Sequence, residues 1–327
     1  MTGLIDSFHR QIDYIRVSVT DRCNLRCIYC TAKLVPHLTH DDILRYEEIH
    51  QVVQAAAGLG VKKIRLTGGE PLVRPELNKL VELLSHVEGI DEISLTTNAI
   101  LLGKYAAQLK AAGLKRVNIS LDTFKADKFR YITSQDKLKD VLGGIEAARN
   151  AGLNPVKINM VVIRGVNDDE LLDFARASVS DGWHVRFIEE MPLVTSRIKE
   201  SKLVAVQEMT ATIQESLGQL EPFWPTSGNG PAKYYQLPGA SGTIGFIGPV
   251  TDCFCSQCNR FRLTADGRLR PCLLEDSEVD LKGPLRRGAS TQELEGLMRQ
   301  AAALKRERHR LSEDFVPGKR QMWQIGG

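Results

Sequence analysis

The chain has 327 residues, of which 43% are hydrophobic and 25% are charged, and its formal net charge is +3. This is the composition of a globular protein that is long enough to bury a large core. Its 43 basic residues nearly balance its 40 acidic ones, so charge gives no reason to expect a nucleic-acid partner. No apolar run reaches the length of a signal-peptide core or a membrane span, and we therefore expect a cytoplasmic protein without membrane contact.

Short β-rich runs alternate with helical runs through the first two thirds of the chain. The expected strands are 15–19, 63–67, 92–96, 116–121, 156–162 and 184–188, and the expected helices are 46–59, 76–87, 104–112, 138–151, 169–179 and 205–217. Six such units predict an α/β fold, an incomplete TIM-type (β/α)6 barrel that is two strands short of closure. Because glycine and proline become frequent after residue 217, we expect a partial-barrel domain over 1–217 and a loop-rich C-terminal domain over 218–327.

The expected strands carry polar side chains on one face. In the first strand, for example, Val17 and Val19 alternate with Arg16 and Ser18. Side chains that alternate along a strand point to opposite faces, so the polar face would line the barrel lumen if helices cover the apolar one. A solvent-facing antiparallel sheet is the alternative, which the regular helical crossovers disfavour. The inward cations are Arg16, Lys63, Arg65, Lys157 and Arg186. Such a group predicts a polyphosphate or similarly anionic ligand.

Three cysteines in CxxxCxxC spacing, Cys23, Cys27 and Cys30, follow the first strand. Closely spaced thiolates select iron–sulfur clusters or zinc. A structural zinc site has four protein ligands, whereas a four-iron cluster on three cysteines leaves one iron open to another molecule. The spacing favours such an open cluster, and a zinc site completed by His37 or His40 is the alternative.

A second cysteine group lies in the last third of the chain. Its members are Cys253, Cys255, Cys258 and Cys272. Four cysteines could close a zinc site, although the two side chains of a CxC pair reach one metal only with difficulty. Arg260 and Arg262 share one face of the extended segment that follows. That face is either solvated or adds two cations to those expected in the lumen.

The motif Gly68-Gly69-Glu70-Pro71 follows the second strand at its C-terminal end, where barrel enzymes place their chemistry. The glycines would let backbone groups approach a ligand closely, and Glu70 could accept hydrogen bonds from an ammonium group. An ordinary strand-to-helix turn is the alternative. The usual nucleotide-binding loops, GxxxxGK[ST] and GxGxxG after a strand, do not occur in the sequence.

Together these motifs resemble the radical S-adenosylmethionine superfamily. They are CxxxCxxC after the first strand, GGEP after the second, Thr-Thr-Asn after the third and Ser-Leu-Asp after the fourth. The resemblance implies that Cys23, Cys27 and Cys30 hold a [4Fe-4S] cluster whose open iron binds S-adenosylmethionine, the source of a 5′-deoxyadenosyl radical. The residues that it implies around this cofactor are Tyr29, Gly68, Gly69, Glu70, Pro71, Thr96, Asn98, Ser120 and Met191.

Within that superfamily, later features are similar to the GTP 3′,8-cyclase family, also called molybdenum cofactor biosynthesis protein A. They are Arg16, the segment FCxxCNRxRLTADG with Cys272 beyond it, the segment 228–235 and the terminal Gly-Gly. The resemblance implies a second [4Fe-4S] cluster on Cys255, Cys258 and Cys272, whose open iron binds the guanine base of GTP. It implies catalytic roles for Arg16, Arg260, Arg262, Gly326 and Gly327, and a triphosphate site made by Arg16, Lys63, Arg65, Lys157, Arg186, Arg260 and Arg262.

The implied reaction is the first step of molybdenum cofactor biosynthesis. A hydrogen leaves ribose C3′, this carbon bonds to guanine C8, and reduction with protonation gives (8S)-3′,8-cyclo-7,8-dihydroguanosine 5′-triphosphate. The implied partners are an external electron donor and the cyclic pyranopterin monophosphate synthase, which would take the product. Another radical enzyme with an auxiliary cluster, such as a peptide-modifying one, is the alternative. The sequence leaves open whether the chain forms a homodimer.

Some positions depart from the family pattern. Thr31-Ala32 stand where the family usually has Met-Pro, and Ala99 stands where glycine is usual. We expect Ala99 to be tolerated with a negative φ angle. Cys253 is not an expected ligand, and it is either a free thiol or a competitor for the second cluster.

Overall fold

The computed structural model describes residues 3–30, 37–191, 203–225, 230–309, 311 and 320–326. Among the positions discussed above, Thr31, Ala32, Gly228, Asn229 and Gly327 lie outside these ranges. The first part contains β1 (Tyr14–Ser18), α1 (Tyr46–Gly58), β2 (Lys63–Thr67), the 3-10 helix η1 (Pro71–Val73), α2 (Leu77–Ser85), β3 (Glu92–Thr97), α3 (Leu102–Ala111), β4 (Arg116–Ser120), α4 (Ala126–Thr133), α5 (Leu138–Asn150), β5 (Lys157–Val162), the 3-10 helix η2 (Asp168–Glu170), α6 (Leu171–Ser180), β6 (His184–Glu189) and α7 (Val206–Leu217).

The C-terminal third adds further short elements. These are β7 (Glu221–Phe223), β8 (Lys233–Gln236), β9 (Thr243–Ile247), the 3-10 helix η3 (Cys255–Gln257), β10 (Arg260–Leu263), β11 (Arg268–Arg270), β12 (Val279–Asp280), α8 (Lys282–Arg286), α9 (Thr291–Ala303) and α10 (Met322–Ile325). The interpretation of this region as loop-rich missed its strands, because they are short and lie among the glycines and prolines that suggested loops.

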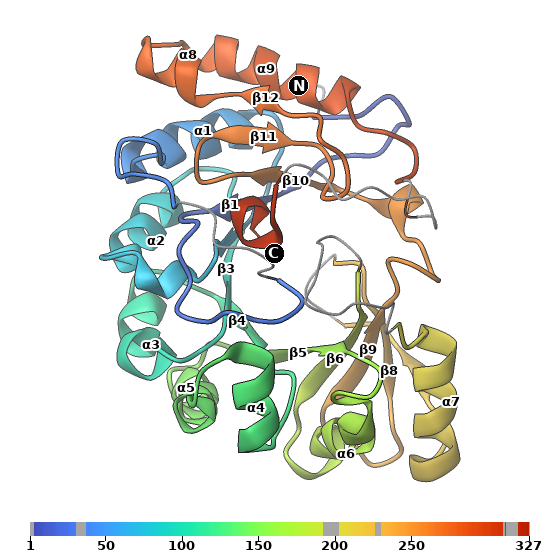
Figure 1. Ribbon diagram of the computed structural model, residues 1–327. Helices are drawn as coiled ribbons and strands as arrows, with labels where there is room; N and C mark the ends of the chain where they lie inside the picture. The colour runs from blue at the N-terminus through green and yellow to red at the C-terminus, as the bar shows by residue number, and fades with distance from the viewer. Residues whose placement is uncertain are drawn as a thin grey trace.

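The strands of the described chain form one 12-stranded sheet with the order β12-β11-β10-β1-β2-β3-β4-β5-β6-β9-β8-β7. The run from β10 through β1–β6 to β9 is parallel. Antiparallel strands continue it at both ends. The sheet curves into an open arc, and α10 lies inside that curve (Figure 1). The predicted partial barrel is present, and β9 and β10 extend its parallel part on both sides without closing it.

The strands and helices expected from periodicity are all found, with ends that differ by a few residues. The short helix α4 was not expected. On the apolar strand faces, Val17, Ile64 and Leu66 are fully buried in the core. Polar residues from the opposite faces line a cavity. The alternation in the sequence therefore identified both faces of the sheet correctly.

The backbone at Ala99 differs from the expectation, because its φ angle is +64°, in the left-handed region. The residue is fully buried, its N–H donates to Thr97 Oγ1 at 3.0 Å, and its carbonyl accepts from the Leu102 N–H at 3.0 Å. These bonds fix a conformation that costs an alanine about 1–2 kcal/mol. The α5 residue Gly144 also packs directly on this turn, since a Cβ there would lie 2.3 Å from the Ala99 carbonyl oxygen. The prediction of a negative φ was wrong, because these local hydrogen bonds and the packing of Gly144 hold the turn in the left-handed conformation.

Candidate active site

One cavity of about 340 Å³ collects nearly all of the predicted site residues. Its lining includes all six predicted ligand cysteines, all seven predicted cations, and every residue predicted around S-adenosylmethionine except Pro71. We call it the central cavity. Both cysteine groups reach it from opposite ends of the sequence, because β10 pairs with β1 and so brings the second group beside the first part of the barrel.

The first cysteine group lies in the loop after β1. The Leu25 N–H donates to Cys23 Sγ at 3.4 Å, and the Cys30 N–H donates to the Cys27 carbonyl at 3.0 Å. Burial raises the pKa of Cys23 to about 11 and holds the pKa of Cys27 well above its usual value. A bound metal would offset this cost of burying thiolates. No disulfide joins any of the seven cysteines, so the thiols are available as ligands.

The histidines proposed as zinc ligands do not complete this group. His37 Nδ1 lies 3.3 Å from Asp21 Oδ2, and its ring packs edge-on against Trp323. His40 is exposed beside Asp41. Within the described ranges, the group of ligand-type atoms found within 4.8 Å of one another is Cys253, Cys255 and His309, and it contains none of the first three cysteines. The sulfur atoms of Cys23, Cys27 and Cys30 are thus farther apart than the ligands of a single ion would be. Such spacing suits a cluster, in which each cysteine binds a separate iron.

The glycines of the GGEP motif pack against the cysteine loop. A Cβ on Gly68 would lie 2.7 Å from the Thr20 carbonyl oxygen, and one on Gly69 would lie 2.5 Å from that of Arg22. The Gly69 N–H also donates to the Thr20 carbonyl at 2.8 Å. The close contact between these two loops therefore already requires glycine at both positions. The sequence analysis had explained the two glycines by the close approach of a ligand.

Glu70 connects the motif to the end of β3. Its carboxylate accepts hydrogen bonds from Thr97 Oγ1 at 2.7 Å, the Asn98 N–H at 2.7 Å and the Leu72 N–H at 3.0 Å. Burial nevertheless raises its pKa to about 7. These protein donors leave one of about four acceptor positions for a ligand. Pro71 begins η1 and has no place in the cavity lining.

Tyr29 and the Ser-Leu-Asp motif meet at the same side of the cavity. The Tyr29 hydroxyl donates to Asp122 Oδ2 at 2.6 Å, and the Val161 N–H donates to Asp122 Oδ1 at 2.9 Å. Burial raises the pKa of Asp122 to about 6. Nearby, Asn98 Nδ2 donates to Asn24 Oδ1 at 2.7 Å, which ties the end of β3 to the cysteine loop. Thr96 Oγ1 is buried without a hydrogen-bond partner, so it is one polar group that a ligand could satisfy.

The cations form a row across neighbouring strands. The sheet register places Arg16 between Arg65 on β2 and Arg262 on β10. Burial lowers the pKa of Arg65 and of Arg262 to about 10, and burial together with Arg262 holds that of Arg16 well below its usual value. Like charges side by side in a cavity destabilise the empty protein. A polyanion bound here would relieve that repulsion.

The opposite wall adds further cations. Lys157 and Arg186 are 3% and 5% exposed, and burial lowers the pKa of both. Lys157 Nζ donates to the Tyr234 hydroxyl at 3.1 Å, while Nε and Nη2 of Arg186 are buried without a partner. Lys63 and Arg260 complete the predicted set in the lining. The unsatisfied guanidinium donors are what an anionic oxygen would bind.

The second cysteine group surrounds the start of β10. Cys255 is the first residue of η3 and Cys258 directly follows that helix, while the Leu274 N–H donates to Cys272 Sγ at 3.5 Å. Burial raises the pKa of Cys272. Burial also acts to raise the pKa of Cys258. The positive charges of Lys305 and Arg260 have the larger opposite effect, so the pKa of Cys258 is lowered to about 7. Its own surroundings therefore favour the thiolate that a metal needs.

The C-terminal tail enters the central cavity. Arg262 Nη1 donates to the Gly326 carbonyl at 2.5 Å, and Trp323 is 5% exposed. Gly326 has a φ angle of +82°, and a Cβ on it would lie 2.5 Å from Thr67 Oγ1. Glycine is therefore required here both by the backbone conformation and by the space.

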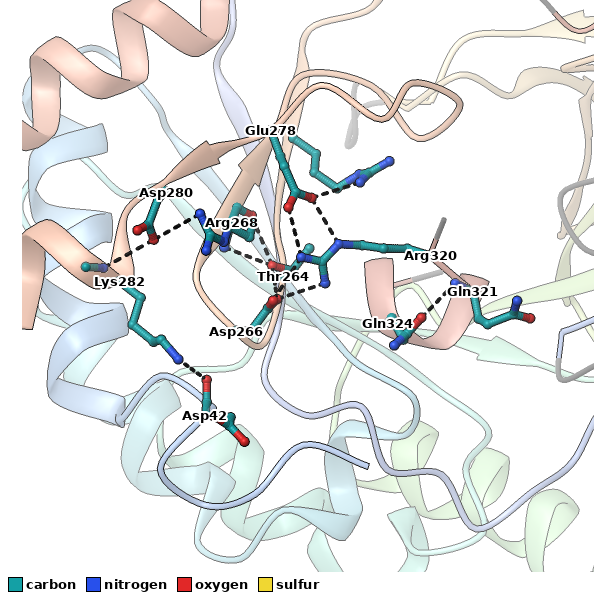
Figure 2. Close-up of polar contacts among 12 residues, drawn as sticks. Asp42, Thr264, Asp266, Arg268, Glu278, Asp280, Lys282, Arg320, Gln321 and Gln324 are labelled. Carbon is teal, nitrogen blue, oxygen red and sulfur yellow. Dashed lines mark hydrogen bonds and ion pairs between the residues drawn. The ribbon is translucent and has the colours of Figure 1, made fainter. Parts of the chain in front are cut away.

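An ion-pair network anchors this tail before it enters. Arg320 donates to Asp266 at 2.8 and 3.1 Å and to Glu278 at 2.9 and 3.0 Å. Figure 2 shows Arg320 between these two carboxylates, with Gln321 and Gln324 of the α10 capping box beside it. The network ties the tail to the β10–β11 turn and to the residue before β12. Sequence reasoning did not identify Arg320.

Three more lining residues escaped the sequence analysis. Tyr14 lies two residues before Arg16 on the same strand face, and the guanidinium groups of Arg65 and Arg260 approach its ring to 5.5 and 6.0 Å. Arg116 begins the polar face of β4 and donates to Glu92 at 2.5 Å. Tyr234 holds Lys157. The alternation that identified the neighbouring residues, followed one step further, would have found Tyr14 and Arg116.

Comparisons with known proteins agree with this geometry. The model of the radical SAM superfamily matches residues 17–177, and that of the molybdenum cofactor synthesis C family matches residues 183–311. A GTP 3′,8-cyclase from Moorella thermoacetica is 52% identical over 98% of this chain and 99% of its own length. This chain belongs to the GTP 3′,8-cyclase family. A relative from Pelotomaculum thermopropionicum with the same name is also 52% identical, with the same coverage. Membership of the radical SAM superfamily implies a [4Fe-4S] cluster and S-adenosylmethionine as the cofactors.

Solved structures support the fold. The crystal structure of Streptococcus suis SuiB bound to S-adenosylmethionine has a TM-score of 0.63, with 12% sequence identity over 88% of this chain and 68% of SuiB. At this identity the likeness concerns the fold alone. Among the helices that the structure describes, none is both long and apolar enough to span a bilayer.

Proposed function

We propose that this protein performs the reaction of its family, the conversion of GTP to (8S)-3′,8-cyclo-7,8-dihydroguanosine 5′-triphosphate, in the central cavity. The observation that supports this best is the composition of the cavity. Two separate cysteine triads line it together with eight cations and three carboxylates. Such a cavity fits a substrate that carries several negative charges and lies between two metal centres.

The residues present fit a [4Fe-4S] cluster on Cys23, Cys27 and Cys30. When bound, this cluster supplies the electron that splits S-adenosylmethionine into methionine and a 5′-deoxyadenosyl radical. Glu70 would offer its remaining acceptor position to the methionine ammonium, and the buried hydroxyl of Thr96 and the Ser120 and Asn98 side chains would hold the rest of the molecule. Tyr29 would contact the adenine, and Met191 lines the same cavity. Exclusion of water from such a cavity would protect the reactive groups.

The cation row holds the triphosphate. Arg16, Arg65 and Arg262 offer charged donors from three adjacent strands, and Lys63, Lys157, Arg186 and Arg260 add charge from either side. This positioning matters for the chemistry because a fixed triphosphate fixes the ribose, and thereby selects the hydrogen at C3′ and brings C3′ close to guanine C8. The cations thus do not contact the reacting carbon; they determine its position by holding the triphosphate.

Cys255, Cys258 and Cys272 would hold a second [4Fe-4S] cluster. With three thiolate ligands such a cluster would keep one iron open for a nitrogen or oxygen of the guanine base, as long as Cys253 and His309, whose ligand atoms lie within 4.8 Å of that of Cys255, do not occupy it. Gly326 lies beside Arg262 at the cavity, and the terminal Gly326 and Gly327 take the catalytic roles that the family resemblance implies. An external donor supplies the electrons, and the product passes to the cyclic pyranopterin monophosphate synthase. The division at residue 217 separates the cofactor-binding part from the part that carries the second cluster, although one sheet runs through both.

The test is anaerobic reconstitution followed by two measurements. Iron and sulfide analysis should give eight irons per chain, and addition of GTP should change the magnetic spectrum of the second cluster while the first keeps its own. Incubation with S-adenosylmethionine, GTP and a reductant should then yield the cyclic product. Four irons per chain, or a second cluster that does not respond to GTP, would contradict the proposed site.

A further inference from the structure

A buried lysine lies against the second cysteine group. Lys305 is 3% exposed, and its Nζ lies 3.3 Å from Cys258 Sγ, 3.2 Å from the Arg260 carbonyl oxygen and 2.6 Å from the Pro271 carbonyl oxygen. An ammonium group has three N–H donors and no acceptor, so these contacts use all of them. The two carbonyls therefore fix the nitrogen in place, and its third N–H points to the sulfur.

The fold determines this position. Lys305 follows the end of α9, and its backbone N–H donates to the Ala302 carbonyl at 3.1 Å. The helix packs on α1, β11 and β12, so it is held by the sheet that also carries the ligands. The acceptors of Lys305 belong to both ligand segments: Arg260 follows Cys258 by two residues, and Pro271 precedes Cys272. The lysine thus bridges the two arms of the site.

Among the residues that the structure describes, no acidic side chain balances the charge of Lys305. No ion pair joins it to a carboxylate there, whereas the next residue, Arg306, pairs with Glu275 at 3.2 Å. A buried ammonium without a counter-ion is costly. Its acceptors within the described ranges are the two neutral carbonyls and the sulfur of Cys258. A cluster on three thiolates is itself negatively charged and would supply the missing counter-charge.

We infer that Lys305 raises the reduction potential of the second cluster, in addition to holding its two ligand segments together. This inference rests on the proposed function, which places a [4Fe-4S] cluster on Cys255, Cys258 and Cys272. Reduction makes the cluster more negative by one charge, and a fixed cation at a ligand sulfur stabilises the reduced form more than the oxidised one. Hydrogen bonds to the sulfurs and the charge around a cluster are established determinants of its potential.

The experiment isolates the second cluster in the full chain by replacing Cys23, Cys27 and Cys30 with serine. This triple variant is reconstituted anaerobically, its iron is counted, and its midpoint potential is measured by redox titration with magnetic detection. Lys305→Met removes the charge and the N–H donors but keeps the length, and Lys305→Arg keeps the charge. We expect the Met variant to be reduced at a lower potential than the parent, and the Arg variant to stay closer to the parent.

Each outcome decides between explanations. A parent with no iron would overturn the proposed second cluster and this inference with it. A parent with four irons and an unchanged or higher potential in Lys305→Met would overturn only the inference and leave Lys305 as a structural bridge. Where Lys305→Met assembles no cluster, Lys305→Gln gives a second neutral variant. Loss of iron in both neutral variants but not in Lys305→Arg supports the role of the charge, and loss in all three contradicts it.

Discussion

The substitution Gly326→Ala should withdraw the tail from the central cavity. At a φ angle of +82° an alanine costs about 1–2 kcal/mol. Its Cβ would also lie 2.5 Å from Thr67 Oγ1, which is held by its own 3.4 Å hydrogen bond to the Val17 carbonyl, and overpacking of this kind costs about 1–3 kcal/mol. The sum, about 2–5 kcal/mol, lowers the ratio of inserted to withdrawn tail at least about thirty-fold, because each 1.4 kcal/mol is a factor of ten.

Two assays report this change, namely the rate of cyclic product formation and the release of C-terminal residues by carboxypeptidase, followed by intact mass. Gly288→Ala is the matched control, since Gly288 has the same φ angle of +82° but nothing within 4 Å of its Cβ. It should lower the free energy of unfolding by the same backbone cost of about 1–2 kcal/mol and leave both assays unchanged. A Gly326→Ala protein with normal turnover and a protected tail would refute the reasoning.

Three further predictions concern other parts of the site. Arg320→Met should expose the tail to carboxypeptidase. Arg268→Met is the control, since it removes a more exposed ion pair with Asp280 in the same region, and it should leave the tail protected. Equal protection of the tail in both variants would contradict the anchoring role of Arg320. Either Arg260→Ala or Arg262→Ala should keep both clusters and 5′-deoxyadenosine formation but abolish cyclisation, and normal cyclic product from either would disprove its role. Because burial raises the Glu70 pKa to about 7, the cofactor-free protein should lose roughly 3 kcal/mol of stability as the pH rises from about 4.5 to 7, and denaturant unfolding of Glu70→Gln should not show this loss.

The barrel strands were predictable because their signals are local. Alternation in β1–β5 and a glycine after several of the helices determine where those elements run and which face is polar. The same alternation placed Arg16 and Arg65 in the lumen. The register between strands is not local, however. That Arg262 lies directly beside Arg16 follows from the pairing of β10 with β1, which no neighbouring residue signals.

Residues that act through tertiary contacts were the ones missed. Lys305 lies in the highly charged run 304–310, which reads as a solvated helix end, and only the fold shows that it is buried against Cys258. Arg320 likewise gives no sign of its two carboxylate partners. The left-handed turn at Ala99 was predicted incorrectly although its hydrogen bonds with Thr97 and Leu102 are local, because the packing of Gly144 against its carbonyl is a tertiary contact that the sequence does not show.

The parallel pairing of β1 with β10 has a consequence for biogenesis. Tyr14 pairs with Arg260. One edge of β1 therefore stays unpaired until most of the chain has been synthesised, because its partner strand β10 is made late. At the usual rate of about 5–20 residues per second, that delay lasts from about ten seconds to almost a minute. Strands β1–β6 can meanwhile assemble and present the first cysteine loop, but the second site cannot form until β10 closes on the exposed edge. We therefore expect the first cluster to be loaded before the proposed second one, on the ribosome-bound or newly released chain.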